Sequence, residues 1–459
     1  MRYGFRTNSK FLVLIFALTC YILFFSFLSV QMNRHYLTSL DYAIFVQSIW
    51  STINQGTFFY SSIIGMSQFG IHNSPILIVL IPVLMIFKNP EVLLIFQTVL
   101  LALGAVPLYL IAREKINESV GIIIGCIYLL YPPLHGVNLY DFHEVAFVPL
   151  LLGFCFYFLL KRNYYCFFIL SLITMTIKED VAFCIVLIGF YALLTIKDAS
   201  REDKILFLLV SIIGLIWLAL TFIVIIPHFN IIQHQSTLIH YEDPLQSITM
   251  FWNEKVEYFF RIFLPIGFIP FFSPGILAIS IPFFAEIFFS SLGMRTNFLS
   301  HSATLIIPLV FITTISGIVW INKKIGKKYP EIIQYILFLI IVLTIISNIT
   351  SPVPQLFSQI NDKPNLHYNN LNTLIEKIPQ NLSISSQTDI LPHIATRNEV
   401  YGKFTDNVDL VLIDTTTIYS SILLEEKEKF TDYSVVYNDD GIILLMAPSS
   451  NKRINSELF

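Results

Sequence analysis

Long apolar runs without a charged residue follow one another along most of the chain. They lie at about residues 11–30, 92–112, 119–139, 145–160, 163–177, 181–196, 205–227, 262–285, 303–321 and 332–350. A helix needs roughly 20 apolar residues to cross a bilayer, and most of these runs are near that length. With 55% hydrophobic and only 13% charged residues, the composition excludes an ordinary soluble protein. The sequence therefore predicts a mainly α-helical, multi-pass membrane protein.

Two apolar segments determine how many helices are expected. The segment PILIVLIPVLMIF, residues 75–87, is only about 13 residues long, which favours a re-entrant or interfacial segment over a full crossing. The run at 262–285 is interrupted by Ser273 and Pro274, which predicts a hairpin of two helices. With these two choices the sequence predicts about 11 transmembrane helices in residues 1–350.

The distribution of lysine and arginine gives the expected orientation. The first apolar run follows Arg2, Arg6 and Lys10 and has no small-residue cleavage site, which indicates an uncleaved signal anchor with a cytoplasmic N-terminus. The basic clusters of the later short loops then fall mainly on the same side, as the positive-inside rule expects. We therefore expect a cell-membrane protein with an extracytoplasmic C-terminal part. A net charge of -3 provides no basic surface for a nucleic acid partner.

This topology collects several short polar motifs on the outer face. In the first outer loop, residues 31–91, apolar residues of SLDYAIFVQSIW recur near helical spacing with Asp41 on the opposite side. That pattern predicts an amphipathic helix lying on the membrane. The structural alternative is that Asp41 or Ser39 only caps this helix, because Asp and Ser are favoured at helix N-termini.

The motif KED, residues 178–180, lies between two apolar runs that end at Ile177 and begin at Val181. The connection is too short to reach far into water, so these charges are expected at the membrane boundary or in a cavity. Ionisable groups in such places are candidates for function. An ordinary loop with an internal ion pair is the alternative, and for YDFHE, residues 140–144, the alternative is a solvated turn.

The composition changes after residue 350. Residues 351–368 are rich in Pro and Asn and predict a linker, and residues 369–459 predict a small extracytoplasmic α/β domain. LNTLIEKIP is typical of a short helix, LSISSQ, NEVYGKF and DLVLID of strands, and YSVVYNDDGIILLMAP of a hairpin that turns at Asp440-Gly441. Because this tail has no phosphate-binding glycine loop and no nucleophile elbow, it is expected to recognise or cover a site.

Several separated motifs together resemble one family. SLDYAIFVQSIW, FGIHNSPILIVLIP, DFHEVAFVPLLL, KEDVAF, SHSATLIIPLVFITTISGI and SISSQTDILPHIATRNEVYGKF are similar to a prokaryotic polytopic membrane family known as domain of unknown function 2079. In its N-terminal half that family resembles the GT-C glycosyltransferases. The resemblance implies a membrane enzyme that takes a sugar from a polyprenyl-phosphate-linked donor at the outer face and transfers it to an envelope glycan, lipid or protein acceptor.

The resemblance also implies roles for individual residues. Asp41 stands where GT-C enzymes carry an acidic residue in the first outer loop, and would act as general base. Asp141 and Glu144 match a second acidic pair in the next outer loop. The leaving lipid phosphate would be met by cationic groups at the membrane boundary, with Glu179 and Asp180 holding the first of them. These candidate groups are Lys178, His72, His143 and Arg295.

Other functions remain open at this point. His, Asp and Glu on converging loops are metal-ligand types, but no H-x3-H or HExxH spacing occurs and Asp41 is followed by Tyr42 where many GT-C members have a second acid. We therefore predict no metal site and no cofactor, with a divalent metal as the less favoured alternative. A transporter or flippase of a lipid-linked or anionic substrate is disfavoured because no internal repeat is evident. A non-enzymatic envelope assembly factor is the third possibility.

Overall fold

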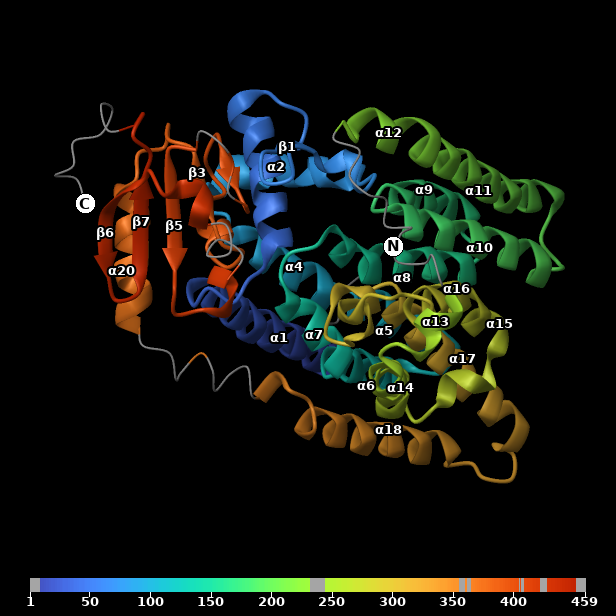
Figure 1. Ribbon diagram of the computed structural model, residues 1–459. Coiled ribbons are helices and arrows are strands. Elements are labelled where there is room, and N and C mark those ends of the chain that lie inside the picture. The colour runs from blue at the N-terminus through green and yellow to red at the C-terminus, as the bar shows by residue number, and fades with distance from the viewer. Residues whose placement is uncertain are drawn as a thin grey trace.

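Figure 1 shows a computed structural model of the chain, in which a large helical body lies beside a small domain built around a sheet. The structure describes residues 9–231, 244–354, 360, 365–403, 405, 408–421 and 427–450. Arg2 and Arg6, on which the expected orientation depends, lie outside the described residues, as does half of the predicted linker.

Among the residues that the structure describes, five helical segments are long and apolar enough to cross a membrane. They are α1 (Ser9–Arg34), the pair α4 and α5 (Val92–Leu103 and Ala105–Lys115), α11 with its extension to α12 (Arg201–Leu220 and Ile226–Phe229), α17 (Ile306–Ile325) and α18 (Ile332–Ile349). A bent pair, α6 (Glu118–Leu129) and α7 (Pro132–Tyr140), makes a sixth if it is one span. The predicted membrane-type helical fold is present.

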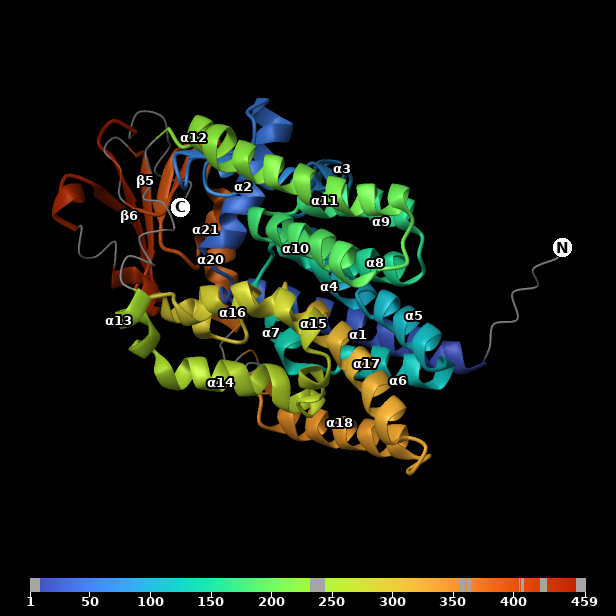
Figure 2. The ribbon, with the colours of Figure 1, turned by 90° about the vertical axis from the view of Figure 1, so that its right-hand side faces the viewer.

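The predicted number of about 11 helices is not confirmed, because several apolar helices are too short to cross by themselves. These are α3 (Leu80–Phe87) with the turn before it, α8 (Val148–Leu160), α9 (Tyr164–Met175), and α15 and α16 (Pro274–Leu277 and Ile281–Phe288). A further helix, α10 (Glu179–Thr195), packs along α11 (Figure 2). The predicted break at Ser273 is present, since a short helical turn ends at Phe272 and α15 begins at Pro274.

Glycine allows α10 and α11 to approach closely. A Cβ atom built on Gly189 of α10 would lie 2.4 Å from the Ser211 Oγ of α11. Small residues at such contacts let membrane helices pack tightly, since packing and interhelical hydrogen bonds replace the hydrophobic driving force there. Ser211 Oγ also donates to the carbonyl of Val186 at 3.0 Å, which ties the two helices together.

Residues 31–91, predicted to form the first outer loop, fold into more structure than expected. Helix α2 (Leu40–Gln55) is followed by a two-stranded hairpin, β1 (Tyr60–Ser61) and β2 (Met66–Ser67). Every residue of α2 from Tyr42 to Ile49 is buried, including the polar Gln47 and Ser48. The predicted helix is therefore present, but it does not lie on the membrane surface as expected, because protein covers its polar face as well.

The C-terminal domain contains the predicted elements. Helix α20 (Asn365–Lys377) begins inside the predicted linker and precedes a five-stranded sheet of order β4-β3-β5-β7-β6, in which β3 pairs in parallel with β4 and β5. The strands are β3 (Ile384–Ser386), β4 (Val400–Tyr401), β5 (Leu410–Asp414), β6 (Ser434–Asp439) and β7 (Ile442–Met446). The predicted hairpin turn is confirmed, with φ of 48° at Asp440 and 77° at Gly441.

The C-terminal domain packs against the first outer loop. Tyr36 donates a hydrogen bond to Asn372 Oδ1 at 2.7 Å, and its ring stacks on His393 with the ring centroids 3.8 Å apart. His393 belongs to the short helix α21 (Leu391–Ile394). Ser62 Oγ donates to the carbonyl of Val400 and accepts from its N–H, both at 2.8 Å. The loop and the tail therefore form one continuous polar and aromatic interface.

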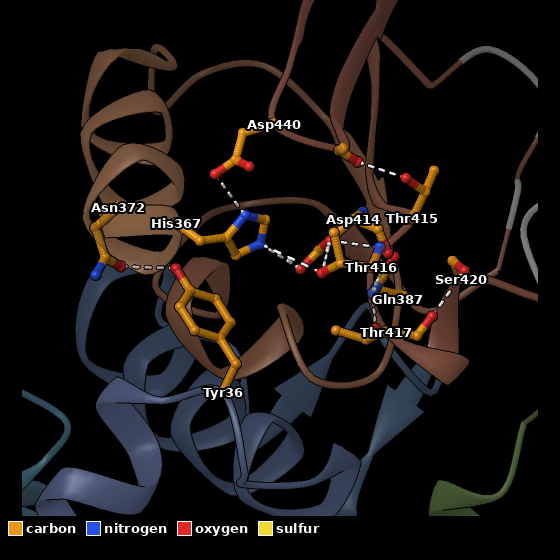
Figure 3. Close-up of polar contacts among 11 residues, drawn as sticks. Tyr36, His367, Asn372, Gln387, Asp414, Thr415, Thr416, Thr417, Ser420 and Asp440 are labelled. Carbon is orange, nitrogen blue, oxygen red and sulfur yellow. Dashed lines mark hydrogen bonds and ion pairs between the residues drawn. The ribbon is translucent and has the colours of Figure 1, made fainter. Parts of the chain in front are cut away.

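One histidine links helix α20 to the sheet (Figure 3). His367 Nε2 is 2.9 Å from Asp414 Oδ2, and Nδ1 is 3.0 Å from Asp440 Oδ2. Burial disfavours the charged imidazolium, but the two carboxylates outweigh it and raise the pKa of His367 above its ordinary value. The protonated ring thus holds three segments of the domain together.

This linkage predicts pH-dependent stability. A raised pKa gives stabilisation that is fully present below the unfolded value of about 6.5 and is lost as pH rises through the folded value. We expect His367→Gln to lower the melting temperature of the full-length protein by about 2–4 °C near pH 6. The difference from wild type should shrink toward about pH 9, when measured by thermal unfolding in detergent. An equal difference at both pH values would contradict a charged linkage.

Candidate functional site

Asp41 lies in the first turn of α2, and the residue that precedes this helix is not a simple cap. Ser39 occupies the N-cap position, but its side chain makes no capping hydrogen bond. Ser39 Oγ instead donates to Asp141 Oδ2, and the Ser39 N–H donates to the same oxygen at 3.2 Å. The capping alternative therefore does not account for Ser39, which connects the start of α2 to the segment that follows α7.

His143 lies between two carboxylates. Its Nε2 is 3.5 Å from Asp41 Oδ2, and its Nδ1 is 3.0 Å from Asp141 Oδ1. The Asp141 side chain is fully buried, whereas 41% of the Asp41 side chain is exposed. Of the three contacting side chains, Asp41 is therefore the one that a ligand can reach, and Asp141 is the one that orients His143.

The charges of this group stabilise one another. Burial opposes a charge on His143, but the carboxylates of Asp141 and Asp41 outweigh it and raise the pKa of His143 to about 10. Burial also disfavours an ionised Asp41, yet the hydrogen bond and charge of His143, together with His72 and Lys178, hold the pKa of Asp41 below its ordinary value. At neutral pH an imidazolium thus faces an ionised Asp41.

The segment that carries Asp141 and His143 is held in a strained conformation. Asp141 has φ of 149° and ψ of -172°, a backbone conformation that residues other than glycine rarely adopt. The buried side chain of Gln97, from α4, donates to the Asp141 carbonyl at 2.5 Å and accepts from the His143 N–H at 2.8 Å. Such strain costs about 1–3 kcal/mol and persists where the surroundings over-determine it, often at functional sites.

The KED motif forms the junction between α9 and α10, but its ion pairs differ from those predicted. Lys178 Nζ lies 3.7 Å from Glu144 Oε1. Glu179 binds His72 instead, with its Oε1 2.6 Å from His72 Nδ1, and accepts from the Asn73 N–H at 3.2 Å. Glu179, the first residue of α10, therefore contacts His72 directly, and it acts on Lys178, as Asp180 does, through its negative charge without a direct ion pair.

Lys178 keeps its hydrogen-bonding capacity. Within the part of the chain that the structure describes, its ammonium group donates no hydrogen bond and has Glu144 as its single ion-pair partner. The Lys178 side chain is 12% exposed and the Glu144 side chain 1%. An ammonium group has three donors, so this one can bind an anion without breaking a protein hydrogen bond.

Two adjoining cavities share Asp41, His72, Lys178 and His301 as lining residues. The larger has a volume of about 230 Å³ and extends between Asp180 and Arg295. The smaller, of about 110 Å³, reaches His143 and Glu144. The structure thus brings together an accessible carboxylate and several cationic side chains from four separate segments of the chain.

Arg295 lines the larger cavity and forms an ion pair with Glu286, which lies shortly before it in the sequence. Its charge is thus partly neutralised within the protein. Lys178 and Arg295 nevertheless lie in one cavity, although they are far apart in sequence. Of the predicted cations, Lys178 is the one whose donors are all available.

Some site residues were not identified from the sequence. His301 stacks on His143 with ring centroids 4.0 Å apart, and Tyr140 lies against both rings. Gln97 sits in the middle of an apolar helix, where a buried amide usually needs specific partners. A carboxamide in an otherwise largely apolar run was the signal that could have identified Gln97, and the motif SHSA could have identified His301.

A metal site is not evident from the geometry. In the described ranges no three His, Cys, Asp or Glu side chains are grouped so that they could hold a metal ion. His143, Asp41 and Asp141 form a linear chain of contacts, and both nitrogens of the imidazole face carboxylates. The groups that the site presents are a carboxylate, an imidazolium and an ammonium.

Comparison with known proteins identifies a family and a fold. A family model described as predicted membrane protein (DUF2079) matches residues 32–444. No curated protein matches the sequence. Among solved structures, that of ArnT from Cupriavidus metallidurans bound to undecaprenyl phosphate matches with a TM-score of 0.58 and 11% identity, and the match covers 95% of this chain and 98% of ArnT.

A second solved structure is that of the archaeal oligosaccharyltransferase AglB from Archaeoglobus fulgidus in complex with an inhibitory peptide and a dolichol-phosphate. It matches with a TM-score of 0.48 and 12% identity over 97% of this chain and 75% of AglB. At these identities the ArnT comparison shows a shared fold, and the expected resemblance to GT-C glycosyltransferases is confirmed at that level.

Proposed function

We propose that this chain, which belongs to the DUF2079 family of predicted membrane proteins, is an integral-membrane glycosyltransferase that uses a polyprenyl-phosphate-linked sugar donor. One observation carries the proposal: Asp41, an accessible carboxylate oriented by His143, and Lys178, an ammonium with unused donors, line the same cavity. A base and an anion-binding cation are the two groups that this reaction requires.

Asp41 would act on the acceptor. An alcohol is a weak nucleophile unless a positioned base accepts its proton as the new bond to the sugar carbon forms. The low pKa of Asp41 keeps its carboxylate ionised, and the contact with His143 fixes the orientation of that carboxylate. His143 and Asp141 would act as positioning residues, because Asp41 is the exposed end of their chain of contacts.

Lys178 would act on the donor. When the bond between the sugar and the lipid phosphate breaks, negative charge develops on the leaving phosphate, and nearby fixed cations stabilise it. Lys178, with Arg295 in the same cavity, supplies that charge, and His72 lines the cavity beside them. The shared fold with ArnT supports a lipid phosphate as ligand, since ArnT was crystallised with undecaprenyl phosphate.

The same proposal includes the placement of the protein. We place the cavity at the extracytoplasmic face of the cell membrane, with a cytoplasmic N-terminus and an extracytoplasmic C-terminal domain, because the basic loop clusters favour that orientation. The acceptor would be an envelope glycan, lipid or protein that approaches from this face. Residues 31–91 and 369–459 would cover the cavity from the outside.

Binding of the carrier is the first test. Purified full-length protein in detergent should be stabilised by undecaprenyl phosphate in a thermal shift assay, and should transfer labelled sugar from a polyprenyl-phosphate-sugar to envelope material. The matched control ligand is undecaprenol, which has the same chain and no phosphate. Equal shifts with both lipids, or proton-coupled uptake of a lipid-linked substrate into liposomes without transfer, would reject a transferase.

A further inference from the structure

A second and larger cavity lies away from Asp41, where the C-terminal domain meets the membrane body. Its volume is about 530 Å³. It is bounded by the C-terminal end of α1, the start of α2, the turn before α4, and the helices α20 and α21 of the tail. The volume lies within the range of about 300–1,000 Å³ that is typical of small-molecule sites.

The walls of this cavity are polar and close to neutral. Carboxamide side chains approach from three segments, namely Gln31 and Asn33 on α1, Asn89 before α4, and Asn369 and Asn372 on α20. The Arg34 guanidinium is neutralised by a bidentate ion pair with Glu91, with N–O distances of 2.9 and 3.0 Å. The Arg34–Glu91 pair therefore offers no unpaired charge that could bind a charged ligand.

Several of these polar groups have no partner within the described part of the chain. The side-chain amides of Gln31 and Asn369 make no hydrogen bond there, and the buried Tyr42 hydroxyl has none either. The Nε2 of His393 is also enclosed and unpartnered among the described residues. The Gln31 and Asn369 amides, one half-buried and the other exposed, are thus open to a ligand rich in hydrogen-bonding groups, whereas the Tyr42 hydroxyl and the His393 Nε2 are enclosed within the protein.

We propose that this cavity is a separate binding site for a neutral saccharide. Each sugar hydroxyl can donate and accept, and each carboxamide offers two donors and an acceptor, so the two chemistries match without any charge. Tyr368 and His35 line the same cavity and add aromatic surface beside the amides. The assignment rests on the walls of this cavity and does not depend on the reaction proposed for Asp41.

The proposal is tested by sugar binding to the full-length protein in detergent. Glucose, galactose, mannose, N-acetylglucosamine and their disaccharides are titrated, with binding followed by saturation-transfer NMR. At least one should bind saturably. Gln31→Leu on α1 and Asn369→Leu on α20 should each weaken binding by about 3- to 10-fold, since each removes one hydrogen-bonding group.

Matched variants separate this site from the one at Asp41. Tyr165→Phe removes a hydroxyl from a tyrosine that is 73% exposed and far from this lining, and should bind like wild type. Asp41→Asn and Lys178→Met should also bind sugar normally, whether or not transfer is detected. Absence of saturable binding to every sugar tested, or wild-type affinity in both Gln31→Leu and Asn369→Leu, would overturn the proposal. Because these two amides lie on different elements, misfolding of one variant leaves the other as the test.

Discussion

Replacing Asp41 with Asn is expected to lower the rate of sugar transfer by about 10²- to 10⁴-fold, the usual contribution of a positioned general base. Asn has nearly the same shape as Asp but cannot accept a proton from the acceptor. The carboxamide can still lie near His143, so the cavity and the donor-binding cations should remain in place. Binding of undecaprenyl phosphate, measured by thermal shift, should therefore be close to that of wild type.

The matched control is Asp198→Asn. Asp198 is 65% exposed and pairs with Arg162, at a turn remote from the cavity lining. This variant should transfer sugar at the wild-type rate. An unchanged rate of sugar transfer in Asp41→Asn would show that Asp41 is not the general base. Loss of carrier binding in the same variant would indicate that Asp41 supports the structure of the cavity.

Replacing Lys178 with Met is expected to weaken binding of undecaprenyl phosphate by about 10- to 100-fold, which is the effect of losing a hydrogen bond to a charged group. Met keeps the length of the side chain but carries no charge. The substitution also leaves Glu144 buried without its cation, which should lower thermal stability. Carrier binding and thermal unfolding are measured on the same detergent sample.

A double substitution separates these two effects. In Lys178→Met with Glu144→Gln, the buried unpaired carboxylate is gone, so thermal stability should recover toward that of wild type. Carrier binding should stay weak, because the ammonium is still missing. Recovery of both properties in the double variant would show that Lys178 serves only to neutralise Glu144. Glu144→Gln alone provides the reference for removal of the carboxylate.

Features set by local sequence patterns were predictable. Turn residues placed the hairpin at Asp440-Gly441, where both residues have positive φ. Strands β3 and β5 followed from short runs of apolar and polar residues. Features set by contacts between distant segments were not predictable. The burial of Gln47 depends on Ser61 and Arg397, and hydropathy within α2 contains no information about either.

The same distinction applies to the site. Asp41, Lys178 and His72 were predicted as one group because parity placed their loops on the same face, and they line one cavity. Which carboxylate pairs with which cation could not be read from the sequence, since adjacency in KED suggested Glu179 whereas the fold presents Glu144 to Lys178. His301 and Gln97 were missed because they come from helices remote in sequence.

Helix α2 belongs to both halves of the molecule. Near its start it carries Asp41. Further along the helix, the side-chain Nε2 of Gln47 donates to Ser62 Oγ and to the main-chain carbonyl of Arg397, and its side-chain Oε1 accepts from Ser61 Oγ. Because the contact in the tail is a main-chain carbonyl, a tail taken from a relative would fit this body only if its backbone near residue 397 lay in the same place. Helix α2 is therefore the element through which a shift of the backbone in the C-terminal domain would reach Asp41.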